Sequence, residues 1–227
     1  MQDRYAGDIG DFGKLALLRS LSPGRKLGVC WYFCTGRGET NNDGKHTKYL
    51  QQPGRFRALD PELFDALQKL TQGERAVEAL EKARLLTEPI WHREPVPCDS
   101  ARDEWFRKMQ KKVDQCSLVF ADPDNGIARS GVTPKHISVD EIRELRREER
   151  ALLVYHHQTR MRGGATIEAR YLALRVDIRP IDVVRIKSYS SRLYFLFGAD
   201  DELRARLHKF AKRWEAEAEL VDVSDRG

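Results

Sequence analysis

The chain has 227 residues, of which 41% are hydrophobic and 33% are charged, with a formal net charge of +5 at pH 7. This length suits one α/β domain with a buried core, and we expect a single domain over residues 1–227. No apolar run approaches the roughly 20 residues that a transmembrane helix needs, and the first residues lack the apolar stretch of a secretion signal. We therefore expect a cytoplasmic protein without a membrane partner, while the mild basic excess suits a nucleic acid.

The predicted elements of the first half are mostly helical. Asp60 followed by Pro61 is a typical helix start, because Asp caps the helix and Pro suits its first position. Up to residue 113 the pattern predicts, in chain order, a helix over Asp11–Leu21 capped by Asp11, a strand over Leu27–Phe33, a loop over 35–48, helices over 60–70 and 74–86, an irregular or strand-like connection over Glu88–Pro97, and a helix over Asp99–Val113.

The second half alternates short apolar strands with helices. The predicted elements are a strand over Ser117–Ala121, a loop over Asp122–Gly131, a helix over Ile142–Glu149, a strand over Ala151–Tyr155, a helix over Thr166–Arg175, a hairpin of strands Asp182–Ile186 and Arg192–Phe197, a helix over Asp201–Glu217, and a last strand over Leu220–Val223. This order predicts an α/β fold with a mostly parallel sheet, helices on both faces, and a C-terminal antiparallel hairpin near one edge.

The four cysteines, Cys30, Cys34, Cys98 and Cys116, lack the paired C-x₂-C spacing of a zinc site. Cys30 and Cys34 fall in or beside a predicted buried strand, where a free thiol packs as a small hydrophobic group. Reduced thiols are the simpler interpretation in the cytoplasm, and we assign no metal site to them.

The turn after the strand over 117–121 is the strongest candidate for chemistry, because open α/β sheets bind ligands beyond the carboxyl ends of their strands. It reads Asp122-Pro123-Asp124-Asn125-Gly126. Carboxylates in this place can accept hydrogen bonds from an amino group, hold Mg²⁺ or act as a base. We expect Asp122, Asp124 and Asn125 to bind the reacting group; the alternative is a turn in which Asp122 only caps the backbone.

The next strand ends in His156-His157-Gln158-Thr159-Arg160. In an extended chain the two imidazole rings point to opposite sides, so at most one is expected to face the site as a base or metal ligand. The other then satisfies a partner in the core. Arg160 is expected to hold a phosphate, with a solvated loop as the alternative.

Two further segments are candidates for cofactor binding. The loop after the first strand contains Gly36, Gly38, Asp43, Lys45 and His46, at a place that holds a nucleotide or cofactor in doubly wound folds. It matches neither G-x-G-x-x-G nor G-x-x-x-x-G-K-[ST]. The opening of the chain carries Asp8, Asp11 and Lys14 before the first helix. These residues form either a capped helix start or a segment that reaches over the site.

The segments Tyr5–Asp8, Asp11–Leu15, Asn42–His46 and Asp122–Gly126 together resemble a widespread, functionally uncharacterised family of bacterial and phage proteins. This resemblance covers nearly the whole chain, and it implies no established activity.

A more distant similarity is to Rossmann-like methyltransferases that modify adenine N6 in ribosomal RNA, and to three-Cys-motif partner proteins. Ala6-Gly7-Asp8, Asp11 and Lys14 are similar to the opening motif of these methyltransferases, and Asp122-Pro123 matches the first half of their catalytic Asp-Pro-Pro-Tyr. The resemblance implies that Asp122 accepts a hydrogen bond from the target amino group, and that S-adenosylmethionine binds near the loop after residues 27–33. Asp124-Asn125 replaces Pro-Tyr, so the motif lacks the aromatic ring that stacks on a flipped base.

The leading hypothesis is a methyltransferase-like enzyme that acts on nucleic acid or a nucleotide with S-adenosylmethionine. An alternative is a metal-dependent nuclease or phosphotransferase, in which Asp122 and Asp124 hold Mg²⁺ or Mn²⁺ and His157 or His46 activates water. A third hypothesis is a non-enzymatic module that binds nucleic acid or protein. Oligomeric state and pathway are left open by the sequence.

Overall fold

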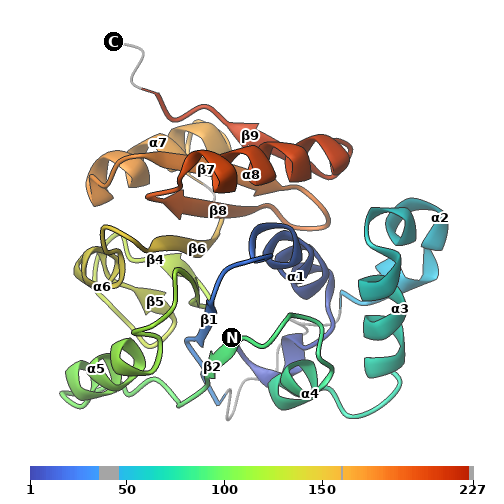
Figure 1. The fold of residues 1–227 in the computed structure, drawn as a ribbon, viewed down its shortest axis with the longest axis horizontal. Helices are drawn as coiled ribbons and strands as arrows, with labels where there is room; N and C mark the ends of the chain where they lie inside the picture. Colours follow the sequence, from blue (N-terminus) through green and yellow to red (C-terminus); the bar gives the residue numbers. More distant parts are fainter. Residues whose placement is uncertain (36–45, 160, 225–227) are drawn as a thin grey trace.

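The computed structural model describes residues 1–35, 46–159 and 161–224. Its main sheet has seven strands in the order β2-β1-β3-β6-β8-β7-β9, which Figure 1 shows with β2 at the lower end and β9 at the top. The strands are β1 (Leu27–Trp31), β2 (Ile90–His92), β3 (Leu118–Asp122), β6 (Ala151–His157), β7 (Ile181–Ile186), β8 (Arg192–Phe197) and β9 (Ala218–Val221). A second, two-stranded sheet pairs β4 (Gly126–Ile127) with β5 (His136–Ile137).

The main sheet is mixed. Strands β2, β1, β3 and β6 pair in parallel, whereas β8 pairs antiparallel with both β6 and β7, and β9 pairs antiparallel with β7. The predicted C-terminal hairpin is confirmed as β7 and β8. Its expected place near an edge is wrong for β8, which lies inside the sheet. Every residue of β8 is buried, and such a strand needs neighbours on both edges and cover on both faces.

The helices vary in length around this sheet. The α-helices are α1 (Ile9–Leu21), α2 (Pro53–Phe56), α3 (Pro61–Leu70), α4 (Val77–Lys82), α5 (Arg102–Lys112), α6 (Val139–Leu145), α7 (Gly164–Val176) and α8 (Asp201–Arg213). Three short 3₁₀ helices are η1 (Asp3–Tyr5), η2 (Lys48–Gln51) and η3 (Arg57–Leu59).

Two hydrophobic cores, one on each face of the sheet, explain the continuous apolar strands. In β3, Leu118 and Phe120 pack into the core beneath α1, α3 and α8, whereas Val119 and Ala121 pack into the core beneath α5, α6 and α7. Figure 1 shows α5 and α6 to the left of the sheet and α1 and α3 to its right. The expectation of helices on both faces is confirmed, because a strand covered on both faces has no polar side.

Several predicted helix boundaries need correction. Helix α1 begins at Ile9 with Asp8 as its N-cap, because the Asp8 side chain accepts a hydrogen bond from the Asp11 amide; the expected cap at Asp11 is wrong. Helix α6 starts earlier than predicted, after Ser138, which forms a capping box with Glu141. The predicted start of α3 is confirmed: the Asp60 side chain accepts from the Leu63 amide, and Pro61 is the first helical residue.

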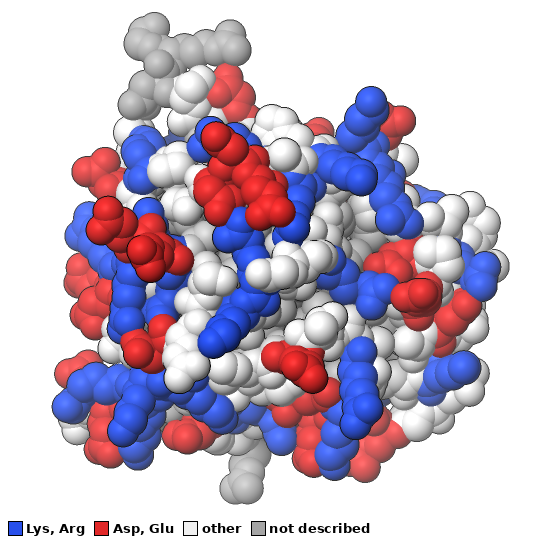
Figure 2. Space-filling model, in the orientation of Figure 1, with Lys and Arg blue, Asp and Glu red and all other residues white. Residues whose placement is uncertain are grey.

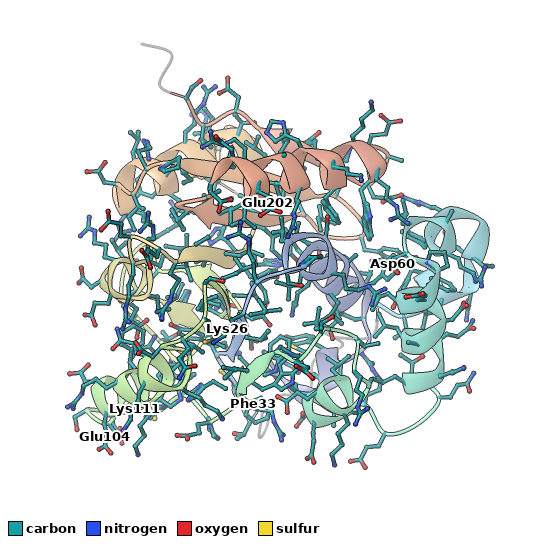
Figure 3. All side chains as sticks on the ribbon, viewed as in Figure 1. Lys26, Phe33, Asp60, Glu104, Lys111 and Glu202 are labelled. Atoms are coloured by element: carbon teal, nitrogen blue, oxygen red, sulfur yellow. The ribbon has the colours of Figure 1, made fainter. Side chains whose placement is uncertain are left out.

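The outer surface is densely charged. Figure 2 shows basic and acidic side chains interspersed over one face, and Figure 3 shows Glu104 and Lys111 of α5 pointing away from the sheet. Within the described ranges, no helix has the length and apolar character needed to cross a membrane. Cys30 is a buried free thiol, as expected for a cysteine that packs as a small hydrophobic group, whereas Cys34 is only half-buried. Cys116 is also a buried free thiol.

Candidate functional site

A cleft of about 340 Å³ lies at the carboxyl ends of β1, β3 and β6, beside the start of α1. Figure 3 labels Lys26 before β1 and Phe33 after it, which shows the direction in which this strand runs. The chemistry-bearing residues of its wall come from three parts of the chain: Asp8, Asp11 and Lys14 from the α1 region, Asp122 and Asp124 from the β3 turn, and His157 from β6. These six sequence-predicted candidates thus meet at the strand ends, as the general rule for open sheets predicts.

Lys14 and Asp122 form the buried base of the cleft. The Lys14 ammonium lies 2.7 Å from Oδ2 of Asp122 and 3.0 Å from Oδ1 of Asp11. All three side chains are nearly inaccessible to solvent. Oδ1 of Asp122 accepts no hydrogen bond from the described residues, so this atom is open to a ligand. Aromatic rings surround the ammonium, with the centroid of Trp31 at 5.1 Å and that of Tyr155 at 5.8 Å.

Burial sets the electrostatics of this cluster. Burial alone would lower the pKa of Lys14, but the carboxylates of Asp122 and Asp11 raise it above its ordinary value. Burial also raises the pKa of the Asp122 and Asp11 carboxyl groups, and one ammonium offsets this only in part. Two buried carboxylates therefore share one positive charge, and the cluster takes up a proton more readily than exposed aspartates do.

The turn after β3 is held from both sides. The carboxylate of Asp124 accepts a hydrogen bond of 2.6 Å from the Gln2 amide and forms an ion pair with the Met1 amino group. That amino group also donates to the carbonyl oxygen of Tyr32 at 2.9 Å. Asn125 is exposed at the cleft. Asp124 thus has its oxygen atoms engaged within the protein, whereas Asp122 keeps one oxygen atom open.

The two histidines at the end of β6 face different surroundings. His156 is buried outside the cleft: its Nδ1 accepts from the Ile127 amide at 3.0 Å, and its Nε2 lies 3.1 Å from Oε1 of Glu168. Burial opposes ionisation of Glu168, but hydrogen bonds from His156 and Thr159 lower its pKa below the usual value. His157 lines the cleft, and its Nδ1 lies 3.2 Å from the Tyr155 hydroxyl. The alternation of side chains along β6 therefore places His157 at the site and His156 in the core.

The expected cofactor-binding residues fall into two groups. Asp8, Asp11 and Lys14 lie in the cleft, and His46 lines it with its ring centroid 5.9 Å from that of Tyr189. The remaining expected residues, Gly36, Gly38, Asp43 and Lys45, lie outside the described residues, as does the expected phosphate ligand Arg160.

The cleft residues that were not predicted from the sequence include Met1, Gly10, Tyr155, Ser190 and Arg192. Tyr155 brings an aromatic ring close to Asp122, although the turn itself lacks one. Tyr155 and Arg192 belong to strands whose apolar sequences predict buried core positions. Only the pairing of β6 with β8 brings these two residues to the cleft. One available signal was the position of Arg192, a charged residue that opens an otherwise apolar strand.

A larger groove of about 1300 Å³ lies near the opposite end of β1, between α1, α3 and α8. Two of its arginines are engaged in ion pairs within the protein: Arg19 with Asp60 at 2.8 Å, and Arg25 with Asp200 at 2.7 Å. It lies at the amino ends of the parallel strands, where open sheets do not bind their ligands. The smaller cleft is therefore the candidate site.

Comparison with known proteins finds no matching protein-family model and no significant match among curated proteins.

Proposed function

We propose that the protein is a methyltransferase-like enzyme that acts on nucleic acid or a nucleotide in the Asp122 cleft. The observation that carries the proposal is the buried Asp122 carboxylate at the end of β3, with Oδ2 held by Lys14 and Oδ1 open. A carboxylate in this position accepts a hydrogen bond from an exocyclic amino group and takes the proton that this nitrogen loses.

The strand arrangement supports a Rossmann-like identity. β8 runs antiparallel between β6 and β7, which themselves point in one direction. The parallel strands β2, β1, β3 and β6, followed by antiparallel C-terminal strands, agree with this part of the fold expectation. Fold similarity alone does not establish an activity, so the proposal depends on the cleft.

The cleft residues fit the charge of S-adenosylmethionine, whose reactive group is a cation. Four carboxylates line the cleft, against the two basic side chains Lys14 and Arg192 and the Met1 amino group. Asp8 and Asp11 would hold the positively charged part of the cofactor. When bound, the cofactor supplies the electrophilic methyl group.

The chain's own residues then orient the acceptor. Oδ1 of Asp122 binds the amino group, Lys14 keeps the carboxylate in place, and the Tyr155 ring offers an apolar surface beside the base. As the nitrogen–methyl bond forms and the bond from the methyl group to sulfur breaks, the proton leaves the nitrogen for the Asp122 carboxylate, whose raised pKa suits it to receive the proton. His157 lies beside Tyr155 and offers a route for this proton to solvent.

The metal-dependent alternative has less support from the geometry. The Lys14 ammonium lies between the carboxylates of Asp11 and Asp122, where it supplies positive charge that a bound cation would otherwise provide. Asp124 is likewise engaged by Gln2 and Met1.

The test is transfer of a labelled methyl group from S-adenosylmethionine to ribosomal RNA and to DNA, in EDTA buffer. We expect Asp122→Asn to lower the transfer rate by about 100-fold or more, because the amide cannot take up the proton. Asp103→Asn, an exposed change on α5, serves as the matched control and should leave the rate unchanged. Transfer that persists in Asp122→Asn would refute the role of this carboxylate, and hydrolysis of nucleic acid that requires Mn²⁺ would favour the nuclease alternative.

A further inference from the structure

Arg192 is a buried cation on the wall of the cleft. It opens β8, and 6% of its surface is exposed. Its Nη1 donates to the carbonyl oxygens of Ser188 at 3.1 Å and Ser190 at 2.8 Å. These two bonds fix the guanidinium plane, so the direction of its remaining donors is set before any ligand binds.

The other edge of the guanidinium is open. Its Nε and Nη2 donate to no acceptor among the described residues, and Arg192 lines the cleft. This edge borders Gly10, at the start of α1. A Cβ atom on Gly10 would lie 2.9 Å from Nε and 3.1 Å from Nη2. Glycine at this position therefore lets the guanidinium edge lie directly against the start of α1, where a larger residue would displace it.

The start of α1 adds a further donor beside the guanidinium. Gly10 lines the cleft, and its amide donates to no acceptor within the described part of the chain. The preceding amide of Ile9 is bonded to the carbonyl oxygen of His46, and that of Asp11 is bonded to Asp8. The first turn of a 13-residue helix also carries a partial positive charge. Arg192 and Gly10 together offer three N–H donors in a setting that favours an oxyanion.

We propose that the Arg192–Gly10 cradle binds a backbone phosphodiester of the nucleic-acid substrate. The assignment rests on the proposed function, because it takes nucleic acid as the molecule that enters the cleft. The guanidinium edge matches two oxygen atoms of a phosphate in a bidentate arrangement. Holding the phosphate here positions the neighbouring nucleotide towards Asp122.

The charge around the cradle favours a monoanion. The Asp8 carboxylate lies beside the same part of α1, since its Oδ1 also lies 2.9 Å from the Cβ position on Gly10. Asp8 offsets much of the positive charge of Arg192. A phosphodiester carries one negative charge, whereas a terminal phosphate monoester carries close to two at pH 7. The cradle therefore suits the interior of a strand better than a 5′-phosphate end.

The first experiment follows the arginine Nε–Hε signals of the full chain by NMR, with the Arg192 signal assigned from Arg192→Lys. The probes are dimethyl phosphate, methyl phosphate and acetate. We expect dimethyl phosphate to shift the Arg192 signal at the lowest concentration. A response to acetate alone would overturn the phosphodiester assignment in favour of a carboxylate site, and no response to any probe would overturn the cradle itself.

The second experiment measures binding of a fluorescent single-stranded 12-mer at several salt concentrations. Arg192→Gln should weaken binding about 10-fold and reduce the salt slope by about 0.7, the value for one contact to a single strand. Gly10→Ala should weaken binding to a similar degree with the Arg192 charge intact, because the new Cβ would displace the guanidinium edge from its place. Arg185→Gln on β7, whose side chain is bonded to Ser191 and Glu219, is the matched control and should bind like the wild type.

The two proposals fail in distinguishable ways. Thermal unfolding first confirms that Arg192→Gln and Gly10→Ala are folded. Wild-type affinity in both variants would overturn the cradle while leaving methyl transfer by Asp122 untouched. Loss of the oligonucleotide affinity in both variants, with no methyl transfer by the wild type, would support the cradle and overturn the proposed reaction.

Discussion

The ammonium group of Lys14 lies 2.7 Å from the carboxylate of Asp122, and joins the first half of α1 to the end of β3 across 108 residues of sequence. Both side chains are buried, so each depends on the other for its charge. The pair links the stability of the fold to the geometry of the cleft. The carboxylate open to a ligand is also the one that a core helix holds in place.

Lys14→Met should destabilise the protein by about 3 kcal/mol at pH 7, because it leaves the buried carboxylates of Asp11 and Asp122 without a positive partner. The loss should be smaller at pH 5, where these carboxyl groups take up protons more readily. Urea unfolding at both pH values measures it. Lys108→Met, an exposed change on α5, is the matched control and should leave stability unchanged. Equal losses at the two pH values would contradict the role of the carboxylates.

The adjacent residues His156 and His157 should respond in opposite ways to alanine substitution. His156→Ala should lower stability by about 3 kcal/mol, since the Ile127 amide and Glu168 lose a buried partner. His157→Ala should leave stability unchanged, because its side chain is exposed at the cleft, and should lower methyl transfer. Urea unfolding and the methyl-transfer assay, applied to both variants, test these two predictions. A stable His156→Ala protein would be incompatible with its structural role.

Gly126→Ala should disrupt the turn that carries Asp124. Gly126 has φ of +92°, and an added Cβ would lie 2.4 Å from Nδ1 and 2.5 Å from Cα of His156. The second atom is backbone and cannot move away cheaply, so we expect a loss of about 3 kcal/mol or more. Gly131→Ala, at φ of +50° with open space around its Cβ position, should cost about 1 kcal/mol from backbone strain alone. Urea unfolding measures the loss of unfolding free energy in each variant. Similar losses at the two glycines would show that the contact with His156 does not contribute to the destabilisation.

His92 should make the fold sensitive to mild acid. It is buried on β2 against Trp105, and burial lowers its pKa to about 4. A lowered pKa gives a stabilisation that is fully present above the unfolded value of about 6.5 and is lost as the pH falls towards 4. Between pH 7.5 and 5 the wild type should therefore lose about 2 kcal/mol more than His92→Phe. Parallel losses in urea unfolding would show that His92 does not titrate in this way.

Local sequence signals predicted those features that depend on short stretches of chain. The Asp60-Pro61 start of α3 is encoded by cap chemistry and by the fixed φ of proline, and the structure confirms it. The cap of α1 was misplaced because Asp8 and Asp11 are both good caps and lie three residues apart. Only the bond from the Asp11 amide to Asp8 decides between them.

The sequence by itself determined the α/β class, the strands buried on both faces, and the gathering of Asp122, Asp124 and one of the two adjacent histidines at one end of the sheet. These follow from hydrophobic periodicity and from the rule that parallel strands end on the same side. Only the tertiary structure decided that β8 enters the sheet between β6 and β7, which brings Arg192 to Gly10 and Tyr155 to Lys14. Such contacts join residues far apart in the chain, and their energy depends on burial and distance, which a local pattern does not encode.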